Sequence, residues 1–242
     1  TRQVEKIKEL ENDIIETNLK LEHKKNDKIQ LMTRREKEKE TLSGEKQEKK
    51  NVIELLKDKE DKLKKDIRDK ERIANQLVNE IKKMIEEENK KRKGLEMLTP
   101  AEKVISTDFK KNMGRLPWPT RKGIVTGYFG EHNHPVFGAD VKISNNGIDI
   151  TTTENSDVRA IFGGKVSKVI AILGANNTVV IRHGNYISVY QNLVDVTVKA
   201  GDEVKIKDKI GIVAKNKNGE YIVHIEIWEE YKKLNPIDWL SK

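Results

Sequence analysis

The distribution of hydrophobic positions divides the chain into two parts. Residues 1 to about 93 contain no proline and a single glycine, and apolar residues recur there at alternating steps of three and four. That spacing is typical of a helical heptad. The repeat is well kept from Val4 to Leu21 and from Ile53 to Met84, whereas lysine and arginine occupy much of it in between. The pattern predicts a coiled coil with a weak middle.

Two arrangements of this segment fit the sequence. Leu42-Ser43-Gly44 can form the turn of an antiparallel hairpin with arms of similar length. Alternatively, the register continues through Gly44 in one long helix whose partner lies elsewhere, because an interior glycine costs only about 1 kcal/mol. We favour the long helix slightly. For the function of this segment, an element that reaches out and docks to a partner and a solvated charged rod are the two alternatives.

The connection between the two parts, residues 94–122, contains a second predicted helix. Gly94 is expected to end the first helix, and Thr99-Pro100-Ala101-Glu102 combines an N-cap, a proline at the first position and an acidic first turn. A short helix over residues 100–112 is therefore expected. Its apolar residues are expected to lie on a groove of the following domain: Val104, Ile105 and Phe109.

From Gly123 onward, short β-branched runs alternate with glycine and asparagine, which predicts strands separated by turns. The predicted strands cover 124–129, 147–152, 157–162, 164–173, 177–183, 186–191, 203–206, 210–215 and 221–228. The predicted fold class is α plus all-β. It comprises a long N-terminal coiled coil (1–93), a linker with a short helix (94–122) and a C-terminal β domain (123–242).

Composition narrows the function classes. Charged residues make up 36% of the chain and hydrophobic ones 35%, and the formal net charge is +8. Most of this charge is mixed in sign, and aromatic residues reach only 5%, so nucleic-acid binding is not expected. The absence of cysteine excludes disulfides and thiol chemistry. The sequence contains no run of about 18 apolar residues, so no membrane span is predicted. The start within a charged periodic segment is expected of a fragment or a mature form.

An ordered series of motifs carries a family resemblance. It begins with Gly114-Arg115-Leu116-Pro117-Trp118-Pro119, continues with Gly127-Tyr128-Phe129-Gly130 and Asn146-Gly147-Ile148-Asp149-Ile150, and ends with Asn235-Pro236 and Trp239-Leu240. The series resembles the EnvC family of murein hydrolase activators, in which a long coiled coil precedes a LytM-type domain. The resemblance implies a LytM-like fold for the β domain.

The LytM fold resembles that of zinc endopeptidases, but the catalytic pattern is incomplete in this chain. The active enzymes carry the motifs His-x-Gly-x-Asp, Tyr-x-His-Leu and His-x-His, which supply three zinc ligands and two catalytic histidines. Asn145 stands at the first zinc-ligand position, and Asn192 and Ile222 stand at the two catalytic histidine positions. Asp149 and His224 remain. The resemblance therefore implies a degenerate site with no catalysis, no catalytic residue and no bound zinc.

The resemblance also implies what such a site does instead. A barrel that has lost its catalytic groups keeps a concave surface that can bind a partner segment. The residues predicted to line that groove are Tyr190, Asn192, Ile222, His224 and Trp228. The implied partner is a periplasmic N-acetylmuramoyl-L-alanine amidase acting in cell division and daughter-cell separation. The coiled coil would connect to a division transporter of the FtsE–FtsX type, and the helix over 100–112 would cover the groove at rest.

Two other classes of function stay open at this point. An active zinc endopeptidase would need unusual ligands, for which His132 and His134 are candidates, although exposed turn residues are the simpler interpretation. A structural periplasmic adaptor shares the combination of coiled coil and β domain. The identity of the amidase and the oligomeric state also stay open.

Overall fold

The computed structural model describes residues 2–91, 98–134, 138–171 and 176–242. The chain forms two compact units, Thr1–Asp69 and Lys70–Lys242. The predicted helix end at Gly94 and the last two residues of the predicted strand 164–173 lie outside the described residues.

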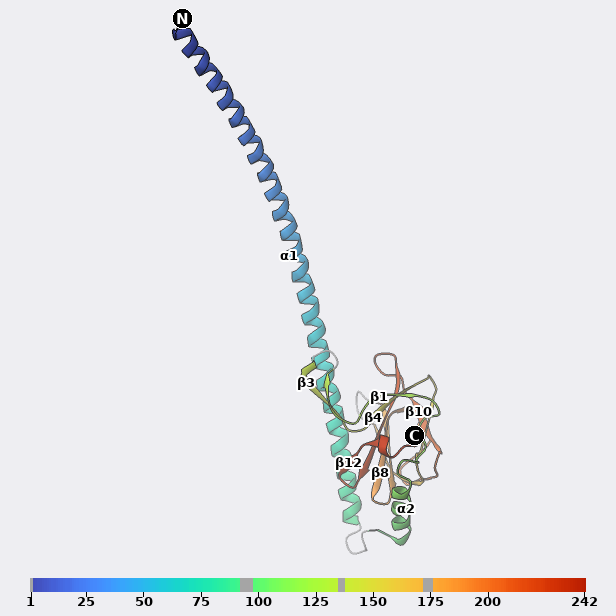
Figure 1. Ribbon diagram of the computed structural model, residues 1–242. Coiled ribbons are helices and arrows are strands. Elements are labelled where there is room, and N and C mark those ends of the chain that lie inside the picture. The colour runs from blue at the N-terminus through green and yellow to red at the C-terminus, as the bar shows by residue number, and fades with distance from the viewer. Residues whose placement is uncertain (1, 92–97, 135–137, 172–175) are drawn as a thin grey trace. The chain divides into compact units, whose positions relative to one another are not determined.

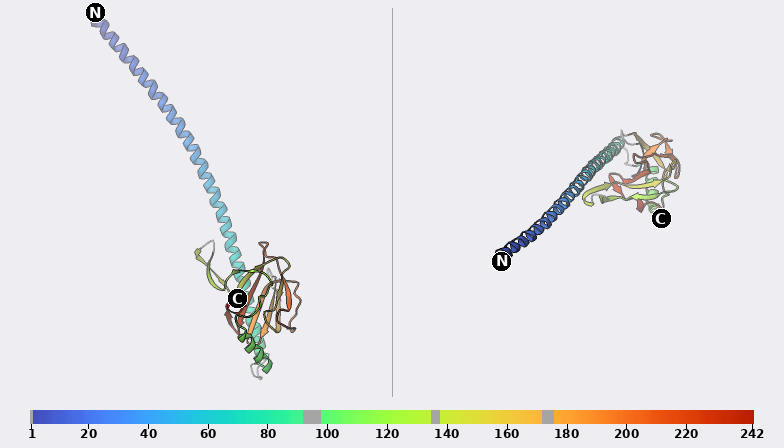
Figure 2. Two further views of the ribbon diagram at one scale, coloured as in Figure 1. Left: turned by 45° about the vertical axis from the view of Figure 1, so that its right-hand side comes forward. Right: turned by 90° about the horizontal axis from the view of Figure 1, so that it is seen from above.

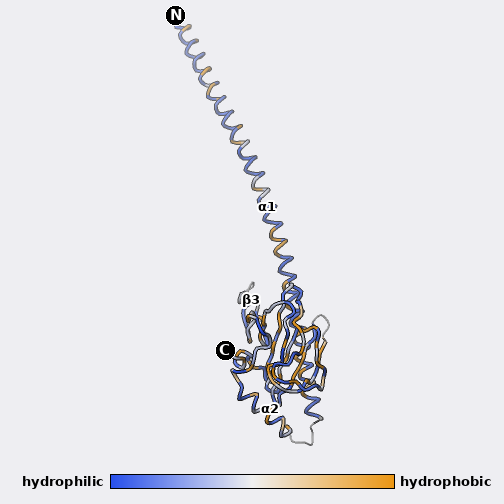
Figure 3. The backbone as a smooth tube through the Cα atoms, turned by 90° about the vertical axis from the view of Figure 1, so that its right-hand side faces the viewer, coloured by the Kyte–Doolittle hydropathy of each residue, from blue (hydrophilic) through white to orange (hydrophobic). Residues whose placement is uncertain are grey.

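Helix α1 (Arg2–Lys91) is one uninterrupted helix, as Figures 1 and 2 show. It continues through Gly44, so the alternative hairpin turn at Leu42-Ser43-Gly44 is not formed. Figure 3 shows that most of its exposed length is hydrophilic, with isolated apolar residues. Glutamate, lysine and leucine have high helix propensity, and pairs such as Glu60–Lys64 (2.6 Å) add a little support.

The predicted coiled coil is wrong. Every residue from Arg2 to Lys62 is exposed, and within the described ranges no second helix packs along them. Apolar residues of the heptad remain open to solvent; Ile7 is 55% exposed and Ile53 is 54% exposed. The physical reason is that helix propensity maintains the helix without a partner, while the lysines on the repeat interrupt the apolar seam that a coiled coil needs.

The predicted all-β domain is confirmed. Its main sheet is antiparallel, with strand order β1-β4-β11-β8-β7-β6-β9, and β5, β10 and β12 join at its sides. The strands are β1 (Ile124–Gly127), β4 (Ile148–Thr152), β5 (Asp157–Arg159), β6 (Gly164–Ala171), β7 (Asn177–His183), β8 (Tyr186–Val194), β9 (Glu203–Val204), β10 (Lys209–Val213), β11 (Tyr221–Glu229) and β12 (Lys232–Leu234).

Each predicted strand overlaps an observed one, and three observed strands were not predicted. Strands β2 (Gly130–His134) and β3 (Gly138–Asn145) form a separate two-stranded sheet, and β12 pairs with the end of β11. Histidine, asparagine and a proline dominate residues 130–137, so the apolar alternation that predicts a strand is missing there.

The central strands are buried on both faces because their alternate residues enter two different clusters. On β11, Val223, Ile225 and Ile227 point into the main β core, whereas Trp228 belongs to a second cluster on the opposite face. The second cluster also contains Ile170 of β6, Val180 of β7, and Ile187 and Val189 of β8. The face that carries this second cluster is called the site face below, because it also carries the residues of the predicted site.

The last turns of α1 cover the site face. Residues 70–91, called the cover segment, place four fully or nearly buried apolar side chains in the second cluster: Leu77, Ile81, Met84 and Ile85. Leu77, Ile81 and Met84 lie on the predicted heptad positions, so the C-terminal part of the predicted seam packs on the sheet. Because the cover segment belongs to the same compact unit as the strands, the units do not divide where the helix ends.

The predicted short helix is confirmed as α2 (Pro100–Lys111). Thr99 and Glu102 form a capping box: the Thr99 hydroxyl accepts from the Glu102 N–H at 3.2 Å, and a Glu102 carboxylate oxygen accepts from the Thr99 N–H at 2.8 Å. A short 3₁₀ helix (Pro236–Asp238) follows β12, and Trp239 and Leu240 after it join the main core.

Candidate functional site

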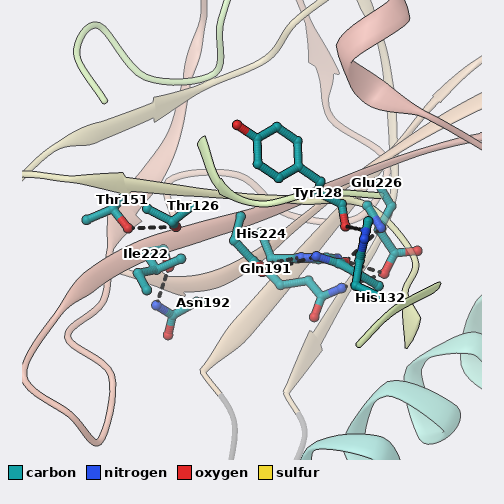
Figure 4. A network of polar contacts seen from close by, with 12 residues as sticks. Thr126, Tyr128, His132, Thr151, Gln191, Asn192, Ile222, His224 and Glu226 are labelled. Atoms are coloured by element: carbon teal, nitrogen blue, oxygen red, sulfur yellow. Dashed lines mark hydrogen bonds and ion pairs between the residues drawn. The ribbon is translucent and has the colours of Figure 1, made fainter. Parts of the chain in front are cut away.

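The predicted site residues from two strands meet where β4 and β11 pair. His224 of β11 lies opposite Asp149 of β4, and Asn145 ends β3 shortly before β4. Strand alternation places Ile222, His224 and Glu226 on the same face as Trp228. Figure 4 shows Ile222, His224 and Glu226 with their polar neighbours Gln191 and Asn192.

His224 is held between two carboxylates. Its Nδ1 lies 2.8 Å from Asp149 Oδ1, and its Nε2 lies 3.3 Å from Glu226 Oε1. Burial alone would lower the pKa of His224, but the hydrogen bonds and negative charges of Asp149 and Glu226 raise this pKa to about 10. The imidazole is therefore protonated on both nitrogens at neutral pH and donates to both carboxylates.

Asp149 is positioned by three elements. Its Oδ2 accepts a hydrogen bond from Asn145 Nδ2 at 3.1 Å, and a Cβ added at Gly127 of β1 would lie only 2.2 Å from the same oxygen. A side chain at position 127 would therefore displace the carboxylate. Burial would raise the pKa of Asp149, but the hydrogen bond and the positive charge of His224 outweigh it, so the pKa is lowered. The charge of Lys70 in the cover segment adds to this lowering.

Glu226 is the polar centre of the site face and was not among the predicted site residues. Only 2% of the residue is exposed. Its Oε2 accepts from Trp228 Nε1 at 2.7 Å, and its Oε1 accepts from Gln191 Nε2 at 2.7 Å. A buried carboxylate is tolerated only when its oxygens are paired. Its place two residues after His224 on a strand is the sequence signal that could have identified it.

Asn192 and Ile222 close the other end of the site. Asn192 has a left-handed backbone (φ 67°), and its amide nitrogen donates to the carbonyl oxygens of Ile222 at 2.6 Å and Ala214 at 2.9 Å. Its side-chain oxygen accepts from Asn176 at 2.6 Å. Because both ends of the amide are engaged in holding the chain, Asn192 has a structural part here, and its amide does not act as an acid or a base at neutral pH.

These residues do not fit a zinc ion of the metallopeptidase kind. Zinc binds neutral imidazole and carboxylate oxygen, and only two of the three ligand positions carry such a group, namely Asp149 and His224, whose Nδ1 is hydrogen-bonded directly to Asp149. Asn145, whose amide is a poor zinc ligand, stands at the other zinc-ligand position. His132 Nε2 bonds to the carbonyl oxygens of Tyr128 and Phe129 at 3.0 and 3.1 Å. The His134 side chain lies outside the described residues.

Four of the predicted residues lie apart from this site. Tyr190 is fully buried in the main core, where its hydroxyl accepts from the Ile161 N–H at 2.9 Å. Of the predicted covering residues on α2, Phe109 is buried among His183, Tyr186, Phe162 and Trp239, whereas Val104 is 59% exposed. Ile105 is partly buried. Helix α2 therefore contacts the β7–β8 turn end of the sheet, and Asn192 lies toward the other end of β8.

Among the predicted groove residues, Trp228 is the one that packs in the cluster of the cover segment, and α2 has no residue in that cluster. Trp228 is completely buried in the cluster that the cover segment completes. Burial lowers the pKa of Lys233 of β12, and the positive charge of Lys82 in the cover segment adds to this lowering. The ammonium group of Lys233 lies 5.3 Å from the centre of the Trp228 ring. The available signal was a second apolar residue, Ile85, next to the heptad position Met84, which widens the apolar stripe beyond a coiled-coil seam.

Comparisons with known proteins identify the domain type. Residues 143–236 match the family described as Peptidase family M23. The chain is 32% identical over 133 residues to the uncharacterized protein NMB1333 of Neisseria meningitidis serogroup B, covering 54% of this chain and 21% of that protein. It is 28% identical over 127 residues to the murein hydrolase activator NlpD of Escherichia coli K12, covering 52% of this chain and 31% of NlpD. The chain thus carries an M23-type (LytM-type) domain with homology to NlpD.

The matched segments are short relative to these proteins. The chain spans less than a third of the length of both curated relatives. Among solved structures, Csd3 of Helicobacter pylori matches with a TM-score of 0.45 at 22% identity, covering 52% of this chain and 35% of that one. Across the described ranges, no helix is both long and apolar enough to cross a membrane.

Proposed function

We propose that this chain is a non-enzymatic activator of a peptidoglycan amidase and that it binds the amidase through the site face. The observation that carries the proposal is the hydrogen-bonded state of the degenerate site. Asn192 and Ile222 stand at the catalytic positions, and a protonated His224 is bonded to Asp149 and Glu226. Neither Asn192 nor Ile222 can transfer a proton at neutral pH, and the carboxylates of Asp149 and Glu226 are engaged by His224, Gln191 and Trp228.

The homology to NlpD supports this class of function, since NlpD is named a murein hydrolase activator. An N-acetylmuramoyl-L-alanine amidase in the bacterial periplasm, acting in cell division, is the partner that the EnvC-like motifs imply. The exposed part of α1 is then the segment available to a transporter of the FtsE–FtsX type. Both partners belong to the proposal.

Regulation follows from the position of the cover segment. Leu77, Ile81, Met84 and Ile85 bury the apolar part of the site face, so an amidase can reach Trp228 only after these residues move away. We assign the covering role to residues 70–91 of α1 in place of α2. The resting chain is therefore expected to activate weakly.

Dye release from labelled peptidoglycan tests the proposal, with the full chain alone, with a cognate amidase, and with a variant that weakens the cover. Ile81→Asp puts a charge into the apolar cluster and should raise release in the presence of amidase severalfold. Asn75→Asp, which adds the same charge at an exposed position of the same helix, is the matched control and should leave release unchanged.

Two results would count against the proposal. Release by the chain alone that a chelator abolishes would identify an active metallopeptidase. Equal release with amidase for Ile81→Asp, Asn75→Asp and the parent chain would show that the cover segment controls nothing. A structural adaptor, the remaining alternative, predicts no stimulation by any of the three.

A further inference from the structure

Two ion pairs tie the cover segment to the sheet. Glu80 Oε2 lies 2.7 Å from Lys168 Nζ of β6, and Glu88 Oε2 lies 2.6 Å from Arg182 Nε of β7. The two glutamates are eight residues apart, which is about 12 Å along a helix at about 1.5 Å per residue. The apolar residues Ile81, Met84 and Ile85 lie between them in the sequence.

The pair formed by Arg182 and Glu88 is the more buried of the two. The side chain of Arg182 is 9% exposed and that of Glu88 is 24% exposed. Arg182 Nη1 also donates to the carbonyl oxygen of Gly184 at 3.2 Å. A guanidinium group cannot lose its charge, and burying it without a carboxylate is strongly unfavourable. A helix that replaces the cover segment is therefore favoured when it places a carboxylate at the position that Glu88 occupies beside Arg182.

The surroundings of this pair leave room for such an exchange. Arg182 and Glu88 line a cavity of about 1080 Å³, whose other charged lining residues are Lys165, Lys205, Glu102, Asp108, Glu203 and Asp208. A carboxylate from an incoming helix can approach Arg182 from this cavity. The second carboxylate position, at Lys168, is more exposed and requires less exact placement.

We propose that the site face recognises an acidic amphipathic helix of a partner protein whose residues repeat the pattern of Leu77–Glu88. This pattern is apolar at positions 1, 5, 8 and 9, with a carboxylate at position 4 for Lys168 and another at position 12 for Arg182. The inference rests on the proposed function and specifies the chemistry of the partner segment. It assigns to Arg182 the selection of partners by charge.

The occupant is a different protein because the cover segment is already attached to the chain. Its covalent connection gives it a high effective concentration at the site face. The same helix from a second copy would bind through identical contacts without that advantage. A helix of different sequence with the same pattern can form better contacts and displace the cover segment.

A binding assay with the full chain tests the inference. The probe is a fluorescein-labelled peptide with the sequence of residues 73–91, measured by anisotropy against the parent chain and against Glu88→Gln. The substitution removes the Glu88 carboxylate from Arg182 and weakens the cover, so the peptide should bind the variant at least about tenfold more tightly. Equal affinity for both chains would contradict this step.

Matched peptides test the role of the carboxylates. A peptide with glutamine at the positions of Glu80 and Glu88 should bind the Glu88→Gln chain at least about tenfold more weakly than the parent peptide. The control peptide has glutamine at the positions of Glu86 and Glu87, which are exposed in α1 and change the net charge equally. It should bind like the parent peptide. Equal weakening of both peptides would overturn the inference.

A further variant and a mass measurement complete the test. Adding Arg182→Gln to the Glu88→Gln chain should remove most of the difference between the two peptides, and a retained difference would overturn the assignment to Arg182. A dimer of the Glu88→Gln chain in sedimentation that excludes the peptide would show that the occupant is a second copy. Peptide discrimination without amidase activation would refute the proposed function and leave this recognition intact.

Discussion

The two helices that flank the β domain are attached to it in different ways. Helix α2 buries one aromatic ring, Phe109, whose centroid lies 4.9 Å from those of His183 and Tyr186. The backbone fits as closely: a Cβ added at Gly184 would lie 2.5 Å from the carbonyl oxygen of Glu102. The cover segment instead lays a row of aliphatic side chains on a sheet face and adds two ion pairs.

This difference indicates which helix can be exchanged. The ring of Phe109 is part of the main core, so removing α2 would open the interior of the domain. The aliphatic residues of the cover segment form a separate cluster, and any amphipathic helix can supply similar contacts. We therefore expect α2 to stay attached to the β domain and the cover segment to be able to detach from it.

The largest expected effect is that of Phe109→Ala. Deleting a buried aromatic ring from a packed core costs about 3–5 kcal/mol, and the free energy of unfolding in urea should fall by that amount. Val104→Ala on the same helix, at a residue that is 59% exposed, should change this free energy by less than about 0.5 kcal/mol. A neutral Phe109→Ala would show that α2 detaches easily and would restore it as a candidate cover.

Much of this arrangement was predictable because local signals determine it. Thr99, Pro100 and Glu102 define the start of α2 by their hydrogen-bonding chemistry alone, and the β-branched runs after Gly123 mark most of the strands. The alternation that sets Ile222, His224 and Trp228 on one face needs only the period of a strand. These elements depend little on contacts between distant segments.

The remainder depended on contacts between distant segments, which a periodic pattern does not specify. The stripe of Leu77, Ile81 and Met84 shows that one side of a helix is buried, but the same stripe suits a second helix or a sheet. Tyr190 was expected to line the groove, but it points into the main core, where its hydroxyl finds a backbone partner at Ile161. The position of Glu226 two residues after His224 placed it on the site face, but its central part there follows only from its partners on β8 and β11.

Two histidines, the buried His183 and the partly buried His224, are expected to have pKa values shifted in opposite directions. His183 packs against Phe109, donates from Nδ1 to the Gly163 carbonyl oxygen at 2.8 Å, and has a pKa lowered by burial from 6.5 to about 4. Its folded form disfavours the proton, so its contribution to stability is present above pH 6.5 and is lost as the pH falls through about 4.

The pKa of His224 is shifted in the opposite direction. Its pKa is raised from 6.5 to about 10, so its contribution to stability is complete below pH 6.5 and is lost as the pH rises through about 10. Urea unfolding across this range should show a loss of stability on the alkaline side that His224→Gln reduces. The acid-side loss should persist in that variant and shrink in His183→Gln. An alkaline loss that persists unchanged in His224→Gln would contradict the doubly bonded imidazolium.

The smallest expected effect is that of Glu80→Gln. The Lys168 side chain is 41% exposed and that of Glu80 is 35% exposed, and ion pairs at such positions contribute about 0–1 kcal/mol. The hydrogen bond from Lys168, with its charge, lowers the pKa of Glu80 below 4.5. The pair therefore stabilises above that pH and is lost as the pH falls. Hydrogen exchange should show slightly faster opening of residues 77–85 in Glu80→Gln, and added salt should reduce the difference from the parent chain.

Because the Glu88–Arg182 pair is more buried, Glu88→Gln should open the same residues further and with less dependence on salt. Equal opening by the two substitutions would mean that Arg182 has no special part in holding the cover segment.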